Sequence, residues 1–204
     1  MTFVKLTNVN LFNNSNYRQM KLLQYKSFAL LLLLFVINPF YAQKTYEANK
    51  EKSKVIIEGT SNIHDWEMYA ETLTSSLELA SNSLEDIAAI AFEVPVKGLK
   101  SGKNKMDKNT YEALKEKDHA KIQFKSSLIE FENGRHYANG DLTIAGITKQ
   151  VKIPFEITKD NNNLILQLAY EINMLDYNVE PPTAMFGTIR TGDKVTTKIN
   201  LIYQ

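Results

Sequence analysis

The segment Ser61-Asn62-Ile63-His64-Asp65-Trp66 holds the side chains of this sequence that are best suited to chemistry. Serine, histidine and aspartate are the members of a hydrolytic triad, in which the imidazole takes the proton of the hydroxyl. Neighbouring residues of an extended strand point to opposite faces, however, so His64 and Asp65 diverge. His64 and Trp66 share one face. They can line the path of a ligand, with His64 near a polar group, or they can serve the fold, with Trp66 closing one end of an apolar interior.

The rest of the sequence offers little for catalysis or metal binding. It has no cysteine, which excludes thiol catalysis, disulfides and cysteine-ligated zinc. His64, His119 and His136 lie far apart and lack the spacing of a helical zinc site. The segment from Gly98 to Asn104 has neither the glycine spacing of a phosphate-binding loop nor the hydroxyl residue after its lysine. We therefore expect no catalytic residue, no metal site and no cofactor.

Hydrophobic residues alternate with polar ones over most of the chain, which indicates half-buried strands. The clearest row runs from Leu164 to Met174, where six apolar residues occupy every second position. Turn signals such as Asn133-Gly134 separate the rows, and short connections favour antiparallel neighbours. The pattern predicts an all-β fold of eight antiparallel strands. These cover residues 53–60, 65–79, 87–97, 121–131, 135–145, 149–158, 163–175 and 193–204.

Three local signals modify this scheme. Asn109 and Glu112 have the spacing of a capping box, so a short helix is expected near 109–117, between the third and fourth strands. Pro95 and Pro154 lie inside predicted strands, and each removes a backbone donor, so a bulge or a gap is expected there. The apolar residues of 65–79 change face near Thr72, which predicts a bulge at that point. Long strands and the need to protect sheet edges favour a curled, barrel-like sheet.

The first 42 residues predict a secretory signal. Residues 28–37 form an apolar run that is too short to cross a bilayer, and Lys21 and Lys26 precede it. We expect cleavage after Ala42 and a mature domain at 43–204, with Met20 as an alternative start. The removed segment carries four basic residues and no acid, so the net charge changes from +1 to −3. This weak charge does not favour nucleic acid as a partner, and the expected location is the periplasm or the medium.

The ordered motifs of this domain resemble the YceI-like family of bacterial lipid- and polyisoprenoid-binding proteins. The motifs are Ser61 to Trp66, Phe92-Glu93-Val94-Pro95-Val96, His119 to Phe124, Gly140 to Lys149, and Gly192-Asp193-Lys194-Val195. The resemblance covers essentially the whole mature chain. It implies an extended lipocalin-like barrel, periplasmic or secreted, that holds a long apolar ligand lengthwise. Asp107 and Tyr111 fit the family pattern before and at the helix only loosely.

The resemblance and the alternation together select the inward residues that would contact a lipid. Alternation alone leaves open whether these side chains fill the interior or line a cavity, and whether the protein carries a lipid, is a solid barrel that binds other proteins, or is an enzyme acting on a lipid. The loop from Lys97 to Lys108 is either a solvated loop or a basic contact for membrane lipid, and a homodimer is possible. The expected ligand-binding residues are His64, Trp66, Met68, Phe92, Val94, Phe124, Leu142, Ile144, Phe155, Leu166, Leu168, Tyr170, Ile199 and Leu201.

The signal hypothesis predicts the N-terminus of the exported protein. We expect N-terminal sequencing of the protein recovered outside the cytoplasm to begin at Gln43. Recovery of the protein with residues 28–37 still attached would indicate an uncleaved membrane anchor instead.

Overall fold

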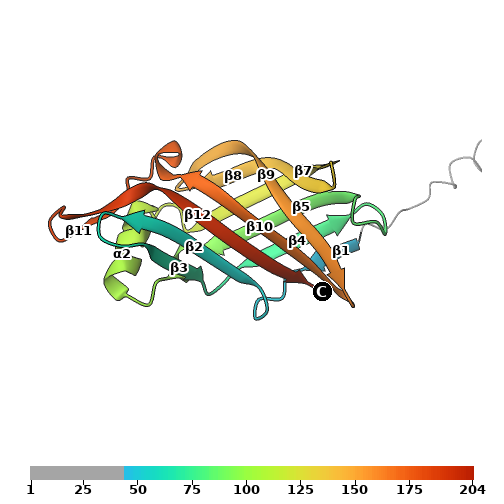
Figure 1. Ribbon diagram of the computed structural model, residues 1–204, viewed down its shortest axis with the longest axis horizontal. Helices are drawn as coiled ribbons and strands as arrows, with labels where there is room; N and C mark the ends of the chain where they lie inside the picture. Colours follow the sequence, from blue (N-terminus) through green and yellow to red (C-terminus); the bar gives the residue numbers. More distant parts are fainter. Residues whose placement is uncertain (1–43) are drawn as a thin grey trace, which may run out of the picture. The chain divides into compact units, whose positions relative to one another are not determined.

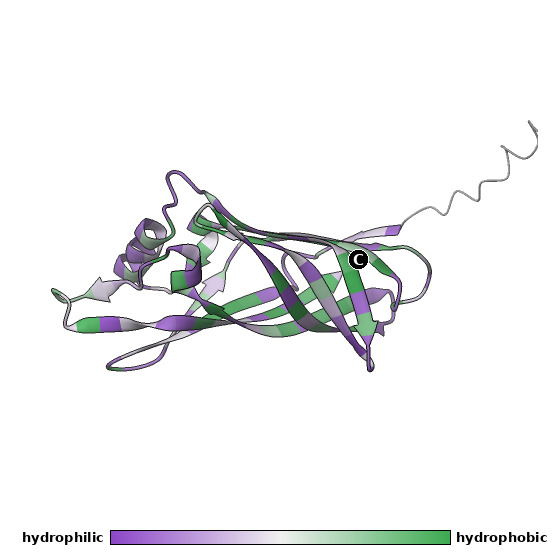
Figure 2. Cartoon of the chain, turned by 90° about the horizontal axis from the view of Figure 1, so that it is seen from above, coloured by the Kyte–Doolittle hydropathy of each residue, from purple (hydrophilic) through white to green (hydrophobic). Residues whose placement is uncertain are grey.

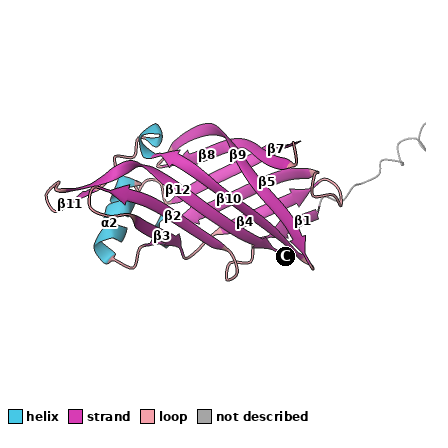
Figure 3. Cartoon of the chain, in the orientation of Figure 1, coloured by secondary structure: helices cyan, strands magenta, loops and turns pink. Residues whose placement is uncertain are grey.

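The computed structural model describes residues 44–204, and the expectations for residues 1–42 lie outside this part of the chain. The described residues form one antiparallel sheet that curls around an apolar interior (Figures 1 and 3). Its strands are β1 (Lys44–Glu47), β2 (Lys54–Ser61), β3 (Trp66–Ala70), β4 (Thr74–Leu79), β5 (Ile87–Pro95), β6 (Leu99–Lys100), β7 (Lys121–Glu132), β8 (Arg135–Ile144), β9 (Ile147–Asp160), β10 (Asn163–Asn173), β11 (Thr183–Ala184) and β12 (Ile189–Tyr203). The helices are η1 (Val96–Gly98), α2 (Asn104–Ala113) and η2 (Met174–Tyr177).

The strand order is β1-β4-β5-β7-β8-β9-β10-β12-β2-β3-β6, and β11 pairs with β12. Further contacts join the two edges of the sheet, at β1 and at β6, to other segments. Ala48, just after β1, forms a bridge with Tyr203 of β12. On the other side, Glu71 N donates to Gly98 O at 2.9 Å and joins the chain after β3 to the turn before β6. Hydrophobic and hydrophilic residues alternate along the strands (Figure 2). Because successive residues of a strand point to opposite faces, the curling turns one of these two sets inward.

The all-β, antiparallel and curled architecture is confirmed, but the count of eight strands is wrong, because twelve strands are present in the described residues. The predicted strand 65–79 is divided into β3 and β4 rather than bulged at Thr72. These two strands have different partners, since β3 pairs with β2 and β6, and β4 pairs with β1 and β5. At the break the chain passes close to η1, where a side chain on Gly98 would press on the Thr72 hydroxyl at 2.5 Å.

The two prolines interrupt the ladders in different ways. Pro95 is the last residue of β5, and η1 follows it. Pro154 keeps its register with Tyr137 of β8, but the pairing of β9 with β10 extends only from Asp160 to Glu156. A residue without an N–H donates to neither neighbour, so the expected local gap at Pro154 is confirmed on its β10 side.

The helix starts and ends earlier than predicted. It covers Asn104–Ala113 instead of 109–117, and Asn109 lies inside it rather than at its N-cap. Lys103 occupies the N-cap position and makes no side-chain capping bond. Contacts of the Asp107 carboxylate with Ser101, six residues earlier, fix the start of this helix instead.

Large side chains fill one half of the interior, the half that lies nearest the last residue of the chain, Gln204 (Figure 1). Phe155 is 1% exposed and Tyr203 is fully buried, with its hydroxyl 2.8 Å from Ser75 Oγ. Burial raises the pKa of Tyr203 to about 12, so its hydroxyl stays protonated at neutral pH. Other buried apolar residues in this half include Val55, Leu77, Leu164, Leu166 and Leu201.

His136 is a second buried titratable group of the filled half, in addition to Tyr203. Its ring stacks on Phe155 with centroids 5.1 Å apart, and Nε2 lies 2.9 Å from the carbonyl oxygen of Leu84. Burial lowers the pKa of His136, because the protonated ring loses its hydration. The unfolded chain then binds this proton more readily than the folded chain, so folding stability falls as the pH drops below about 6.5.

We expect the His136→Phe variant to lose this part of the pH dependence. The denaturant midpoint should be measured between about pH 7.5 and pH 5, above the range in which most carboxylates titrate. The wild type should lose stability across this range more steeply than His136→Phe, and the exposed-site variant His64→Gln should follow the wild type. Equal slopes for wild type and His136→Phe would contradict the assignment.

Candidate ligand-binding cavity

The other half of the interior is hollow. A cavity of about 440 Å³ is lined by residues of α2, β3, η2 and β11. In Figure 1, α2, β3 and β11 are at the left of the sheet. Pockets of about 300–1,000 Å³ accommodate small organic ligands. Cavity and filled core therefore occupy different halves of one interior, and the hollow space does not run along the whole barrel as the family resemblance implied.

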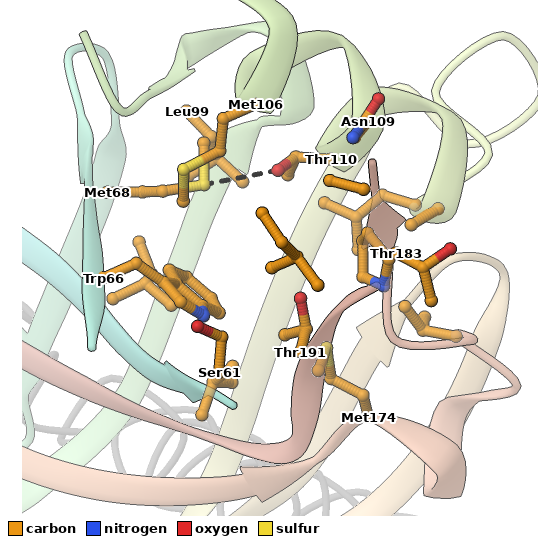
Figure 4. Close-up of a pocket in the computed structure, with 18 of the residues that line it drawn as sticks. Ser61, Trp66, Met68, Leu99, Met106, Asn109, Thr110, Met174, Thr183 and Thr191 are labelled. Atoms are coloured by element: carbon orange, nitrogen blue, oxygen red, sulfur yellow. Dashed lines mark hydrogen bonds between the residues drawn. The ribbon is translucent and has the colours of Figure 1, made fainter. Parts of the chain in front are cut away.

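Methionines distinguish the cavity from the filled half. Met68, Met106, Met174 and Met185 all line it, and they are all the methionines of residues 44–204. In Figure 4, Met68 and Met106 lie on one side of the space and Met174 on the opposite side. Methionine is unbranched and polarisable, so a wall of methionines adapts to ligands of different shape. The wall thus favours an apolar ligand over one with many fixed polar groups.

Trp66 forms one wall by lying flat on the sheet. Its Nε1 donates to Thr60 O at 3.0 Å, and it is paired across the strands with Gly59. A side chain at Gly59 would collide with the indole ring. Glycine at this position therefore lets the indole pack against β2 instead of entering the cavity.

Helix α2 covers the cavity and is held by polar contacts at both ends. The carboxylate of buried Asp107 accepts from Ser101 N at 2.8 Å and Ser101 Oγ at 2.6 Å. Further along, the Tyr111 hydroxyl receives Lys100 Nζ at 2.8 Å, and this hydrogen bond raises the pKa of Lys100. Between these contacts Thr110 Oγ1 donates to Met68 Sδ at 3.3 Å (Figure 4). Helix α2 is thus fixed to β3 through Met68 and to the segment that precedes the helix through Lys100 and Ser101.

His64 lies at the exposed mouth of the cavity. Its Nδ1 is 2.7 Å from Asp65 O, and Ser61 Oγ donates to His64 O at 2.7 Å. The serine hydroxyl also accepts from His64 N at 3.2 Å, so both of its roles serve the turn. The structure therefore combines the two alternatives for His64: the residue satisfies backbone groups and also lines the mouth.

Tyr177 adds one polar group to the wall. It lines the cavity and is buried, and this burial raises its pKa to about 12. The phenol is therefore a neutral hydrogen-bond donor at neutral pH. It can pair with a single polar group of an otherwise apolar ligand.

Four of the predicted ligand-binding residues line this cavity: His64, Trp66, Met68 and Ile144. The remaining ten are outside its wall. Alternation identifies the inward face of a strand but not the height along the interior at which a residue lies. Six of the ten are buried in the core, namely Val94, Phe124, Leu142, Phe155, Leu166 and Leu201, and four are partly buried against it, namely Phe92, Leu168, Tyr170 and Ile199.

Sequence reasoning missed the wall residues that come from helices and short strands. These include Met106 and Ala113 of α2, Met174 and Tyr177 of η2, and Met185 after β11. Of these, only Met174 belongs to a long alternating row, as its last residue. The placement of methionines in the mature sequence is the signal that could have found several of them.

The lysines from 97 to 108 separate into two groups. Lys97 pairs with Glu116 at 3.2 Å, and Lys100 is bonded to Tyr111. Lys103 and Lys105 line the cavity mouth instead and are exposed. Only the second group is placed to meet an anionic partner at the mouth.

Residues 44–204 contain no group of three histidine, aspartate or glutamate residues placed to hold a metal ion. No helix within these residues has the length and apolar character to cross a membrane.

Comparison with known proteins identifies a family and several solved structures to which this chain is similar. The model of a family described as YceI-like domain matches residues 46–203. No curated protein matches the chain. Among solved structures, BcnA of Burkholderia cenocepacia superposes with a TM-score of 0.66 at 18% identity, covering 76% of this chain and 98% of that one.

Two further solved structures share the fold. A polyisoprenoid binding domain from Saccharophagus degradans, implicated in plant cell wall breakdown, gives a TM-score of 0.56 at 10% identity and covers 78% of this chain and 97% of its own. The YceI protein of Campylobacter jejuni gives 0.56 at 14% identity, with coverage of 66% and 82%. At these identities the likenesses show a common fold.

Removal of the Asp107 carboxylate should loosen α2. In Asp107→Ala the partly buried N–H and hydroxyl of Ser101 lose the carboxylate as an acceptor, and hydrogen bonds to a charged group contribute about 1.5–3 kcal/mol. Amide hydrogen exchange should show faster exchange across Asn104–Ala113, while Asp118→Ala, at an exposed site, should leave that exchange unchanged. Unchanged protection of α2 in Asp107→Ala would show that other contacts hold the helix.

Proposed function

The chain belongs to the YceI-like domain family, and on that premise we propose that it binds an isoprenoid or a similar long-chain lipid in the cavity under α2. The observation that carries this proposal is the division of one continuous apolar interior into a filled half and a hollow, methionine-lined half. The polyisoprenoid binding described for the Saccharophagus degradans domain supports the same ligand class. The role would be that of a carrier or a reservoir, and we place it outside the cytoplasm because of the signal expected at residues 1–42.

The energetics of such a cavity suit reversible binding. Each buried CH₂ contributes about 0.8 kcal/mol, so about ten of them contribute about 8 kcal/mol. This corresponds to a Kd of roughly micromolar before the costs of association. The wall residues Thr110, Tyr177, Thr191 and Thr197 carry hydroxyl groups, which supply a few polar contacts within a mostly apolar wall. A carrier needs this balance, because it must release what it binds.

The filled half limits how a long ligand can lie. Phe155, Leu164 and Tyr203 leave 2% or less of their surfaces exposed and close the interior toward the C-terminus. A chain longer than the cavity would therefore extend through the mouth near His64 rather than through the barrel. We propose this one-ended binding in place of the lengthwise arrangement.

The geometry favours binding over turnover. The Ser61 hydroxyl, the nucleophile considered for a hydrolase, is engaged by the backbone of His64 and supports the turn after β2. Lipid extraction of the purified protein followed by mass spectrometry separates the possibilities: a bound isoprenoid supports the carrier, and a chemically altered one would indicate an enzyme.

Trp66 is the only tryptophan of the chain and lines the cavity, so its fluorescence reports on occupancy. We expect farnesol or geranylgeraniol to shift its emission in a saturable titration. Ala113→Phe, which places a ring in the cavity, should weaken this binding by about tenfold or more. Ala169→Phe introduces the same ring at an exposed position of β10 and is the matched control. Equal affinities for the two variants would contradict the assignment of the cavity.

A further inference from the structure

Large apolar side chains are exposed beside the cavity mouth. Phe186 is fully exposed, Met185 is 62% exposed and Ile63 is 56% exposed. Met185 and Ile63 line the cavity, and Phe186 lies at the tip of the hairpin between β11 and β12. We call these three residues the apolar rim. Exposed apolar groups that adjoin one another on a secreted or soluble domain mark interaction sites.

The fold holds the apolar rim in place. Asn62 Oδ1 accepts from Arg190 N at 2.9 Å, and Asn62 Nδ2 donates to Thr188 O at 2.9 Å, so the turn after β2 and the hairpin are fixed side by side. Met185 and Phe186 have φ values of 51° and 56°, which bulky residues rarely adopt. Such strain persists where the surrounding structure enforces it, and it is concentrated at functional sites. The tip therefore presents Phe186 outward rather than folding it onto the sheet.

Positive charge accompanies the apolar rim. Lys103 and Lys105 line the same mouth, and Lys108 is exposed one turn further along α2. Within residues 44–204, none of these three ammonium groups has a carboxylate within 4.0 Å. Asp65 on the turn after β2 and Glu180 before β11 are exposed acids beside the mouth, and Arg190 of β12 is a further exposed cation there. The four cations, Lys103, Lys105, Lys108 and Arg190, therefore outnumber these two acids. Apolar side chains beside lysines match the surface of an anionic bilayer, with acyl chains below charged headgroups.

We propose that the apolar rim and the lysines of α2 dock on an anionic lipid bilayer, so that the cavity mouth opens onto the membrane. This inference rests on the proposed function, because a lipid that extends through the mouth would otherwise cross water on its way to or from a membrane. The rim inserts Phe186 among the lipids, and Lys103, Lys105 and Lys108 contact the headgroups. The docked state then lets an apolar chain pass directly between bilayer and cavity.

The test is co-sedimentation of the full chain with vesicles of phosphatidylcholine and phosphatidylglycerol. Phe186→Ser should weaken binding by about tenfold or more, since a phenyl ring is lost from the lipid phase. Leu128→Ser removes an exposed apolar side chain from β7, away from the mouth, and should change binding by less than about twofold. All variants share residues 1–43, so any contribution of that segment cancels. Vesicles of phosphatidylcholine alone, or added salt, should weaken wild-type binding.

The outcomes separate this inference from the proposed function. Docking is overturned if Phe186→Ser binds the anionic vesicles as the wild type does. It is also overturned if the substitution abolishes self-association of the chain and leaves vesicle binding unchanged, since a second copy would then cover the rim. Farnesol titrations followed by Trp66 are run in parallel without vesicles. A normal titration with Phe186-independent vesicle binding refutes only the docking. Vesicle binding that depends on Phe186, without any response of Trp66 to farnesol, supports docking and refutes the cavity ligand.

Discussion

The interior of a curled sheet has a fixed inward face, and the volume of the side chains on that face decides whether it is filled or hollow. In this protein the two outcomes occur in one interior. Phe155, Tyr203 and the leucines around them fill the half toward the C-terminus. Toward α2 the wall includes four methionines and four threonines, Trp66 lies flat against β2, and a space of about 440 Å³ remains. The other features of the site depend on this change in packing along the sheet.

Polar contacts keep the hollow half from collapsing. The sheet does not close this end by itself, and α2 covers it through Asp107, Thr110 and Tyr111. Gly59 has no side chain, so the ring of Trp66 can lie flat against β2 and stays out of the space. Rigid polar attachment and an adaptable methionine wall have complementary effects: the first preserves the cavity, and the second lets it accept apolar molecules of different shape. The same fold occurs in the polyisoprenoid binding domain from Saccharophagus degradans.

Sequence reasoning identified the sheet because period-two alternation is a local property. It predicted the all-β architecture, the inward face of β10, and the gap beside Pro154. It failed where distant contacts decide the structure. The break between β3 and β4 depends on their separate partners. The start of α2 was missed for another reason: it depends on a contact between Asp107 and Ser101, six residues earlier, which the capping-box pattern does not describe. Only part of the site was predicted, because distant contacts decide it as well. The inward orientation of a residue is a local property of its strand, whereas the packing of strands that are distant in the sequence decides which half of the interior is filled.

The central claim is that an apolar chain occupies the α2 half of the interior and leaves the other half unchanged. Methyl-selective NMR of protein labelled at methionine and leucine methyl groups tests it directly. Geranylgeraniol should shift the methyl signals of Met68, Met106 and Met174, while those of Leu77 and Leu164 in the filled half stay in place. Unchanged methionine signals at saturating ligand, or shifts confined to the leucines of the filled half, would contradict the account.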